Sequence, residues 1–233
     1  MSATVIVFWI VFSVLLISLL FVYNKEAGDR KMKTADISFD AMIAAIILLM
    51  GFVPQIGYIT IVPGLSLTLL HIPVILGASI KGRRHGLFFG AIFGLTSCLQ
   101  AIANPIGLNF FFVYPWISFP PRMLFGYLCG LFFELMRKNP RIGRKALLIG
   151  GVSFLSTCLH TVLVFGDLLI FYSGNIIPLF TSGEKVSETL SLTFVGLIGV
   201  GMCGEALLAG IIVPALKKAL NRALPNLGEN GRL

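Results

Sequence analysis

The chain has 233 residues, of which 57% are hydrophobic and only 12% are charged, and its formal net charge is +8 at pH 7. Seven membrane spans of about 20 residues each would use most of this length, so little remains for a water-soluble domain. The positive charge stands at the ends of apolar runs, where attraction to anionic lipid accounts for it, and we therefore expect no nucleic-acid partner.

Lysine and arginine occur in clusters that alternate with long apolar runs. All but two of the eighteen fall within residues 25–33, 81–84, 137–145 and 217–232, and the other two are Arg122 and Lys185. The loops around residues 53–64, 104–116 and 172–187 carry almost no cation. Because short loops rich in Lys and Arg stay on the cytoplasmic side, the pattern predicts a multi-pass protein of a bacterial cell membrane, with its N-terminus outside and its C-terminus in the cytoplasm.

In chain order, the apolar runs predict seven transmembrane helices. Their approximate bounds are Ala3–Tyr23, Asp36–Phe52, Leu65–Ile80, Gly86–Ala103, Ile117–Met136, Ala146–Phe171 and Leu190–Leu216. We therefore expect an all-α polytopic membrane protein with a six-helix bundle over residues 36–216. An additional N-terminal helix and a basic cytoplasmic hinge would occupy residues 1–35, and a polar cytoplasmic tail would occupy residues 217–233.

Glycine spacing predicts a close contact between two of these helices. Gly86, Gly90 and Gly94 recur at every fourth position of one helix, and Gly126 and Gly130 follow Arg122 at the same spacing in the next. Rows of small residues let helix backbones approach each other within a membrane. The second row also places Arg122 near the protein-facing side of its helix.

Three ionisable residues within the predicted spans are candidates for a binding site. With a rise of 1.5 Å per residue, His71 lies about 9 Å, Arg122 about 7 Å and His160 about 16 Å from the outer ends of their helices. All three are expected in the outer half of the bilayer, where ionisable groups are costly and usually functional. Arginine suits a carboxylate because its planar guanidinium donates two parallel hydrogen bonds.

Polar and aromatic residues of the outer loops are predicted to surround these three. They are Gln55, Tyr58, Gln100, Asn104, Asn109, Tyr114, Trp116 and Asn175. A hydrogen-bonding, aromatic set around one cation predicts a pocket for a small polar molecule with a negative group. Asp167 and Glu205 are weaker candidates for the same site.

Each candidate residue also has a structural interpretation. Arg122 could extend to the outer headgroups, and the two histidines could form hydrogen bonds between helices, for His160 the favoured interpretation. Asn109 could cap a turn. Tyr114 and Trp116 are typical of an aromatic belt at the membrane interface.

The sequence lacks the short motifs of several enzyme classes. It contains no G-x-x-x-x-G-K-[ST] sequence of a nucleotide-hydrolysing loop, no H-E-x-x-H metal helix and no G-x-S-x-G elbow. We therefore expect a binding or transport subunit without catalytic residues, a metal site or its own ATPase site. A membrane-embedded enzyme that acts on lipid through His71 or His160 with a carboxylate, and an autonomous secondary transporter, are the alternatives.

Three stretches together resemble a known family. Residues 63–77 (PGLSLTLLHIPVILG) resemble the second core helix of the substrate-binding S components of energy-coupling factor (ECF) vitamin transporters. Residues 86–97 (GLFFGAIFGLTS) and 120–130 (PPRMLFGYLCG) resemble the third and fourth. The similarity covers about residues 36–216, and the combination is most similar to the pantothenate-specific members.

The resemblance implies a six-helix protein that binds a vitamin near the extracellular side. With pantothenate as the ligand, Arg122 would bind the carboxylate, while Asn109, His71, Gln100 and Tyr114 would bind the hydroxyls and the amide. Loop 53–64 would close over the ligand. Another vitamin or a pyrimidine precursor is the alternative within the same class.

The resemblance also implies protein partners. S components dock on a module of two cytoplasmic ATPase subunits and one transmembrane scaffold subunit, and they topple in the membrane to carry the substrate inward. ATP is used by these partners, and no cofactor is expected on this chain. The family's docking surface includes a row of small residues on the first core helix, which Ala41 and Ala45 match here. The additional N-terminal helix departs from the family's six spans.

Overall fold

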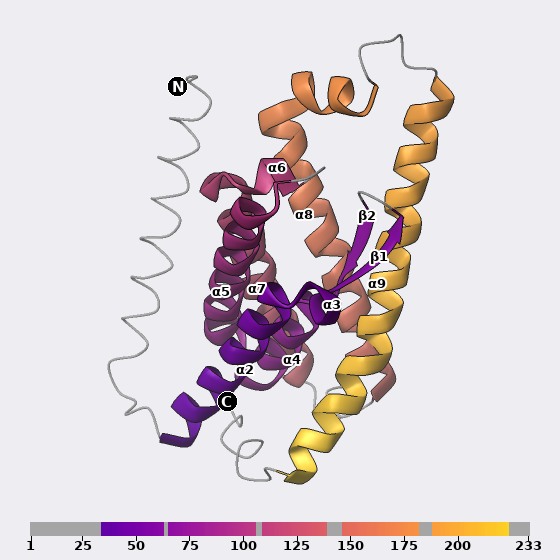
Figure 1. Cartoon of the computed structure of the whole chain (residues 1–233). Coiled ribbons are helices and arrows are strands. Elements are labelled where there is room, and N and C mark those ends of the chain that lie inside the picture. The colour runs from indigo at the N-terminus through magenta and orange to yellow at the C-terminus, as the bar shows by residue number, and fades with distance from the viewer. Residues whose placement is uncertain (1–33, 63–64, 106–108, 139–145, 182–187, 224–233) are drawn as a thin grey trace.

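The computed structural model describes residues 34–62, 65–105, 109–138, 146–181 and 188–223 (Figure 1). Its helices are α2 (Thr34–Phe52), α3 (Pro54–Gly57), α4 (His71–Lys81), α5 (Arg83–Ala103), α6 (Asn109–Phe112), α7 (Pro115–Arg137), α8 (Ala146–Thr181) and α9 (Glu188–Ala223). Its strands are β1 (Tyr58–Val62) and β2 (Leu65–Thr68). The additional helix expected at Ala3–Tyr23 lies outside the described residues.

The long helices follow the apolar runs of the sequence. α2, α5 and α7 begin and end within a few residues of the expected bounds, and α8 and α9 extend beyond them. In the described part of the chain, Arg83–Ala103, Ala146–Phe171 and Gly199–Ala223 are long and apolar enough to cross a membrane. The 21 residues of α5 correspond to about 30 Å, the thickness of the hydrocarbon core. The prediction of an all-α membrane bundle is confirmed.

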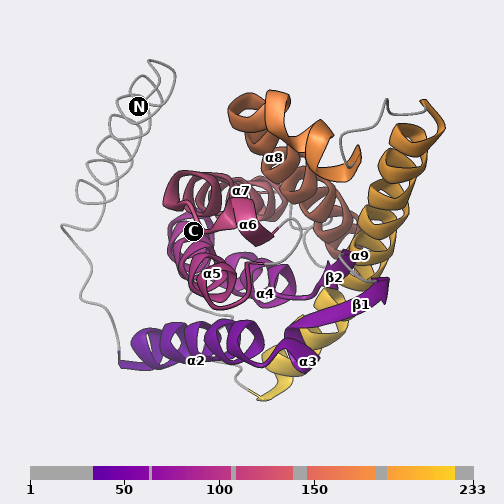
Figure 2. The same ribbon diagram turned by 45° about the horizontal axis from the view of Figure 1, so that its top comes forward.

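Helix α4 lies in the middle of the bundle, although it is too short to cross a bilayer. Its 11 residues correspond to about 16 Å of helix. Every residue from His71 to Ile80 is buried, and Figure 2 shows α4 enclosed by α2, α5, α7 and α9. A helix that is apolar on every face is expected in such a core position. His71, its first residue, therefore faces protein and not lipid.

The glycine rows of α5 and α7 face each other, as the sequence predicted. A Cβ atom on Gly86 would lie 2.2 Å from the carbonyl oxygen of Gly126, and one on Gly90 would lie 2.3 Å from that of Arg122. The hydroxyl of Ser118 donates to the carbonyl oxygen of Gly94 across the same contact, at 3.1 Å. This close approach fixes the backbone of Arg122 against α5.

A β-hairpin precedes α4, where the sequence predicted the beginning of a helix at Leu65. Tyr58 pairs with Thr68 in its antiparallel register. The backbone N–H of Thr68 donates to Oε1 of Glu205 in α9, and Figure 1 shows the hairpin beside α9. Pairing within the hairpin satisfies backbone groups that are costly to leave unpaired in apolar surroundings. The predicted helix was therefore wrong in its first part.

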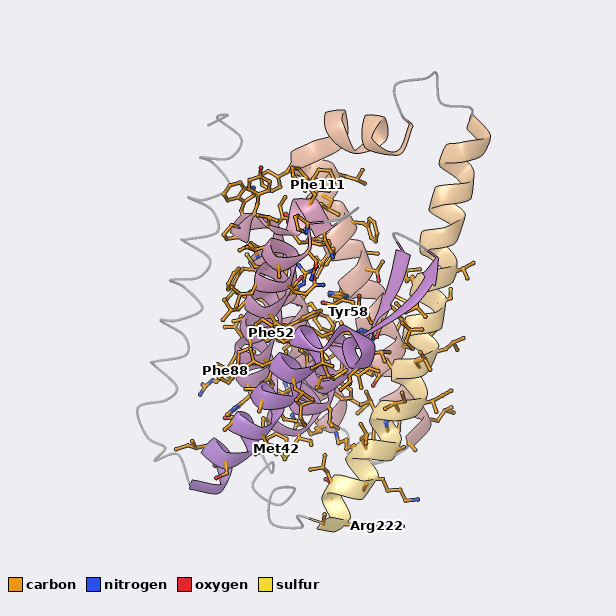
Figure 3. All side chains as sticks on the ribbon, viewed as in Figure 1. Met42, Phe52, Tyr58, Phe88, Phe111 and Arg222 are labelled. Atoms are coloured by element: carbon orange, nitrogen blue, oxygen red, sulfur yellow. The ribbon has the colours of Figure 1, made fainter. Side chains whose placement is uncertain are left out.

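Cations from two basic clusters meet at the C-terminal end of α4. Nζ of Lys217 donates to the carbonyl oxygen of Ser79 at 2.8 Å, and Nη1 of Arg137 donates to that of Ile80 at 3.1 Å. Cations near a helix C-terminus interact favourably with its partial negative charge. These contacts lie toward the end of the bundle where Figure 3 shows Arg222, so the described basic residues of these clusters gather at one end of the protein.

Two carboxylates of α2 join this basic end. Asp36 forms an ion pair with Lys81 of α4, and Oδ2 of Asp40 lies 2.9 Å from Nδ1 of His85 in α5. Both contacts are only partly buried, so each contributes modestly to stability. They attach α2 to the central helices at its N-terminal half.

Candidate substrate-binding site

Arg122 lies inside the bundle, with only 5% of its surface exposed. Its Nη1 donates to the carbonyl oxygen of Ser118 at 2.9 Å. The guanidinium carbon lies 5.2 Å from the centre of the Phe93 ring and 4.7 Å from that of Phe112. Arg122 is thus held by cation–π contacts with two aromatic faces. It does not extend to the lipid headgroups, which was the alternative interpretation of its position.

Two prolines just before Arg122 alter the hydrogen bonding of α7. Pro120 and Pro121 lie inside the helix and lack the backbone N–H that would donate to the carbonyl oxygens of Trp116 and Ile117. Helix interruptions at membrane depth are tolerated where protein or a polar cavity satisfies the exposed backbone groups. The segment that holds Arg122 therefore has a locally polar backbone.

The charge of Arg122 interacts with side chains from three other elements. These are Tyr58 of β1, Cys98 of α5 and Asp167 of α8. Nε of Arg122 is buried and has no hydrogen-bond partner among the described residues. Because leaving a donor of a charged group unsatisfied costs free energy, an acceptor brought by a ligand would be stabilised at this position.

His71 and His160 form a stacked pair deeper in the bundle. Their ring centres are 6.0 Å apart and their planes differ by 19°. Phe93 and Phe125 contact the ring of His160 at centroid distances of 5.3 Å and 4.9 Å. In the part of the chain that the structure describes, none of the four ring nitrogens has a hydrogen-bond partner. Each imidazole can therefore donate one hydrogen bond and accept another, as neutral imidazoles do.

Together these groups provide one cation, two buried imidazoles and an aromatic enclosure. Such a set suits a small molecule with a carboxylate and neutral hydrogen-bonding groups. The residues that the structure describes contain no group of three or more His, Cys, Asp or Glu side chains placed to hold a metal ion. The geometry therefore supports binding of a small organic acid.

The family model described as "ECF transporter, substrate-specific component" matches residues 35–220, most of the chain. The chain belongs to this family. It is 27% identical over 203 residues to the "Pantothenate transporter PanT" of Leuconostoc mesenteroides subsp. mesenteroides, with 85% of this chain and 98% of the relative covered. It is 30% identical over 213 residues to the "Pantothenic acid transporter PanT" of Lactococcus lactis subsp. cremoris, with 83% of this chain and 100% of the relative covered.

Membership of this family establishes which class of protein the chain is. ECF substrate-specific components, or S components, are transport subunits and not enzymes. The chain is accordingly a multi-pass membrane protein that binds a substrate and docks on an energy-coupling module. The buried polar cluster around Arg122 is then the candidate site for that substrate.

The structure brings together the three ionisable residues that the sequence placed in the outer half of the bilayer. Arg122, His71 and His160 come from α7, α4 and α8, and the charge of Arg122 acts on His160, which in turn stacks on His71. The prediction that Arg122 faces the protein is confirmed. The roles of the three residues in this S component stay predictions.

A second group of predicted residues lies at the C-terminal end of α5. Nδ2 of Asn109 is 3.4 Å from Oε1 of Gln100 and 3.4 Å from the carbonyl oxygen of Asn104. Phe112, at the other end of the short helix α6, lies over Arg122. The amide group of Asn109 is therefore connected to the guanidinium through one turn of helix.

The aromatic residues at the beginning of α7 pack on one another. Tyr114 and Trp116 stack with a centroid distance of 4.9 Å and contact an apolar cluster that includes the buried Phe111. These contacts fit packing at the end of the bundle, and a role in ligand binding stays a prediction. The side chains of Gln55 and Asn175 lie outside the described part of the structure.

Several residues at the site were not selected from the sequence. Those that contribute rings are Phe93, Phe112 and Phe125. The chain has 20 phenylalanines, so these had no distinguishing signal. Tyr58 was only one of several loop residues, and Asp167 was a weak candidate. Asp167 follows His160 by seven positions, which places both on one helix face, and this spacing could have identified it.

The small residues expected to mediate docking lie on the surface of α2. Ala41 and Ala45 are both exposed. Because residues four apart lie on the same helix face, the two form one small-residue row that is accessible to another helix. Its role in docking stays a prediction.

Proposed function

We propose that this S component binds pantothenate from outside the cell and delivers it to the cytoplasm after docking on its energy-coupling module. The names of the two relatives support pantothenate as the substrate. The observation that carries the proposal is the buried guanidinium of Arg122, whose Nε has no hydrogen-bond partner within the described segments of the chain. Pantothenate offers what this site lacks, because it has one carboxylate, an amide and two hydroxyl groups.

In this proposal, Arg122 binds the carboxylate with two parallel hydrogen bonds, while the rings of Phe93 and Phe112 hold the guanidinium in place. Charge-assisted bonds of this kind are short and strong. The remaining polar groups of the ligand are bound by His71, His160, Asn109, Gln100, Asn104, Tyr114 and Trp116.

The distribution of charge supports the orientation. Lys217 and Arg137 lie at the end of the bundle opposite the outer loops, and basic ends face the cytoplasm. Tyr58, which Figure 3 shows between Phe111 at one end and Arg222 at the other, lies on the hairpin that precedes α4. The hairpin and residues 53–57 before it would cover the bound ligand and exclude water.

Delivery requires partner subunits. The proposed module contains two cytoplasmic ATPase subunits and one transmembrane scaffold subunit, and the row of Ala41 and Ala45 contacts the scaffold. ATP is hydrolysed by the partners, so this chain binds the vitamin without a cofactor. Small-residue rows allow the close helix contact that such docking needs.

The substrate can be identified directly. Protein purified from cells grown in rich medium is denatured, and the released small molecules are identified by mass spectrometry. Pantothenate, in a stoichiometric amount, is the expected result. Release of another vitamin or of a pyrimidine precursor would overturn the substrate assignment while leaving the protein class unchanged.

The role of Arg122 is tested by calorimetric titration of the purified protein with pantothenate. Loss of one partner of a buried charge pair costs at least about 2 kcal/mol, so Arg122→Ala is expected to weaken binding by about 30-fold or more. Arg222→Ala, at an exposed position in the last turn of α9, is the matched control and should bind as the wild type does. Full affinity in Arg122→Ala would refute the carboxylate contact.

A further inference from the structure

Helix α8 presents a stripe of polar residues to the interior of the bundle. Ser153, Ser156, Thr157 and His160 are buried along it, and Asp167 follows two turns after His160. Residues seven positions apart lie on one face of a helix, here about 10 Å apart along its axis. Asp167 therefore extends the polar stripe toward the outer end of the protein.

Asp167 differs from Ser153 and Thr157 in its hydrogen bonding. Ser153 and Thr157 donate to carbonyl oxygens of their own helix, at 2.8 Å and 3.0 Å, as hydroxyls in helices commonly do. An ionised carboxylate only accepts hydrogen bonds and cannot use these carbonyls. Oδ2 of Asp167 is buried and has no partner among the described residues. A buried carboxylate oxygen is costly in a membrane protein and is usually retained for a function.

Arg122 lies near the part of α8 that carries Asp167. Leu168, the next residue of α8, belongs to one buried cluster with Phe111 and Ile117. Phe112 packs against the same cluster and lies over the guanidinium, and Phe93 contacts both the guanidinium and the ring of His160. The charge of Arg122 also acts on both His160 and Asp167. In the described part of the structure the two side chains form no direct ion pair, and Arg122 directs Nη1 to Ser118 instead. A molecule held by the guanidinium therefore has its other groups within reach of Asp167.

We propose that Asp167 determines specificity by accepting a hydrogen bond from a hydroxyl group of the ligand whose carboxylate Arg122 binds. The inference rests on the proposed function and assigns a role to a residue outside the set proposed above. A second carboxylate on the ligand would be repelled by Asp167, whereas a hydroxyl would form a short O–H···O⁻ bond. The site thus selects acids with one carboxylate and a distant hydroxyl and rejects dicarboxylates.

The test combines variants of Asp167 with analogues of the ligand. Full-length protein in lipid nanodiscs is titrated with pantothenate and with two analogues, each of which has one hydroxyl replaced by hydrogen. A hydrogen bond to a charged group corresponds to about tenfold or more in affinity. Wild-type protein is expected to bind one of the two analogues about tenfold or more weakly than it binds pantothenate. Asp167→Ala is expected to bind pantothenate more weakly than the wild type does by the same factor.

The loss of affinity caused by Asp167→Ala and the loss caused by removing the hydroxyl group of the ligand should not add. If Asp167 contacts that hydroxyl, Asp167→Ala has no further loss with the same analogue, because both changes remove one interaction. Asp167→Asn keeps a neutral acceptor oxygen and should lose less affinity than Asp167→Ala. The asparagine variant also provides the test if the alanine variant fails to fold. Asp36→Asn, at the opposite end of the bundle, is the matched carboxylate control and should bind as the wild type does.

Three results would overturn the inference. Unchanged affinity for pantothenate in both Asp167 variants would show that the carboxylate does not contact the ligand. An equal loss for pantothenate and for both analogues would show a structural role. Tighter binding of pantothenate would show that Asp167 competes with the ligand for Arg122. Wild-type protein that binds no pantothenate would instead refute the proposed function itself.

Discussion

Arg122 is held by one directional hydrogen bond and by two less directional contacts with aromatic rings. The carbonyl of Ser118 accepts from Nη1 along one direction, whereas the guanidinium carbon lies over the rings of Phe93 and Phe112. A planar, delocalised cation can satisfy both at once and still direct donors from its edge toward a carboxylate. A lysine ammonium is a compact, strongly hydrated charge and lacks this geometry.

Arg122→Lys should therefore weaken binding although the charge is retained. We expect a loss of about tenfold or more for pantothenate, because one charge-assisted hydrogen bond is lost. Calorimetric titration measures it, and Arg222→Lys is the matched control at an exposed position. Wild type and Arg122→Lys should differ much less in their affinity for an analogue in which a CH₂OH group replaces the carboxylate. Equal affinity of Arg122→Lys and wild type for pantothenate would show that a point charge is sufficient.

Some of these residues could be predicted from the sequence, for a physical reason. An ionisable group within an apolar run is so costly that Arg122, His71 and His160 were informative by their position alone. The rings that enclose them were not, because phenylalanine in a membrane span is expected whether or not it contacts a ligand. Tyr58 needed the fold, since only its interaction with the charge of Arg122 distinguishes it from the other loop residues.

Among the helices, the contact of α5 with α7 has the most direct effect on the site. Gly90 packs against the backbone of Arg122 itself, and Ser118 bonds across to Gly94. Neighbouring atoms at the glycine contacts belong to the backbone, which cannot move aside as a flexible side chain can. The position of the guanidinium therefore depends on a contact that no side chain can enter.

Gly90→Ala should separate α5 from α7. The new Cβ would lie 2.3 Å from the carbonyl oxygen of Arg122, and overpacking of this kind costs about 1–3 kcal/mol. Thermal unfolding in detergent should show reduced stability, and pantothenate affinity should fall with it. Gly151→Ala is the matched control, because that exposed helical glycine has nothing within 4 Å of an added Cβ. Equal stability of the two variants would contradict the close contact.

The hairpin shows where reasoning from apolar runs fails. Residues 58–68 are as apolar as the helices around them, and periodicity cannot distinguish a short buried strand from a helix. Two β-rich runs separated by Pro63 and Gly64 were the available signal for a hairpin. The backbone N–H of Thr68 is satisfied by Glu205 of α9, a contact between distant parts of the chain that the sequence cannot reveal.

The proposed ligand-binding and docking sites occupy separate parts of the protein. The buried cluster around Arg122 is built by α4, α5, α7 and α8, whereas Ala41 and Ala45 lie on the exposed face of α2. α2 is attached to the central helices by the pairs of Asp36 with Lys81 and Asp40 with His85. A change on the outer face of α2 should thus affect transport without changing the binding site.

Ala41→Leu should reduce transport without changing ligand binding. A larger side chain on the small-residue row would obstruct close approach of a scaffold helix, and a steric penalty of about 1–3 kcal/mol weakens docking at least about fivefold. Uptake of labelled pantothenate into vesicles that contain this S component, the energy-coupling module and ATP should fall accordingly. Calorimetric titration of the isolated variant should give wild-type affinity.

Ala215→Leu, on an exposed position of α9, controls for the general effect of a larger side chain on a lipid-facing helix and should retain both activities. If uptake by Ala41→Leu matches that of the wild type, the row on α2 does not contact the scaffold. If the variant loses affinity in isolation, the change has disturbed the bundle, and the separation of binding from docking is refuted. The expected pattern, loss of uptake with binding retained, requires the two surfaces to be independent in the isolated subunit and coupled only in the assembled transporter.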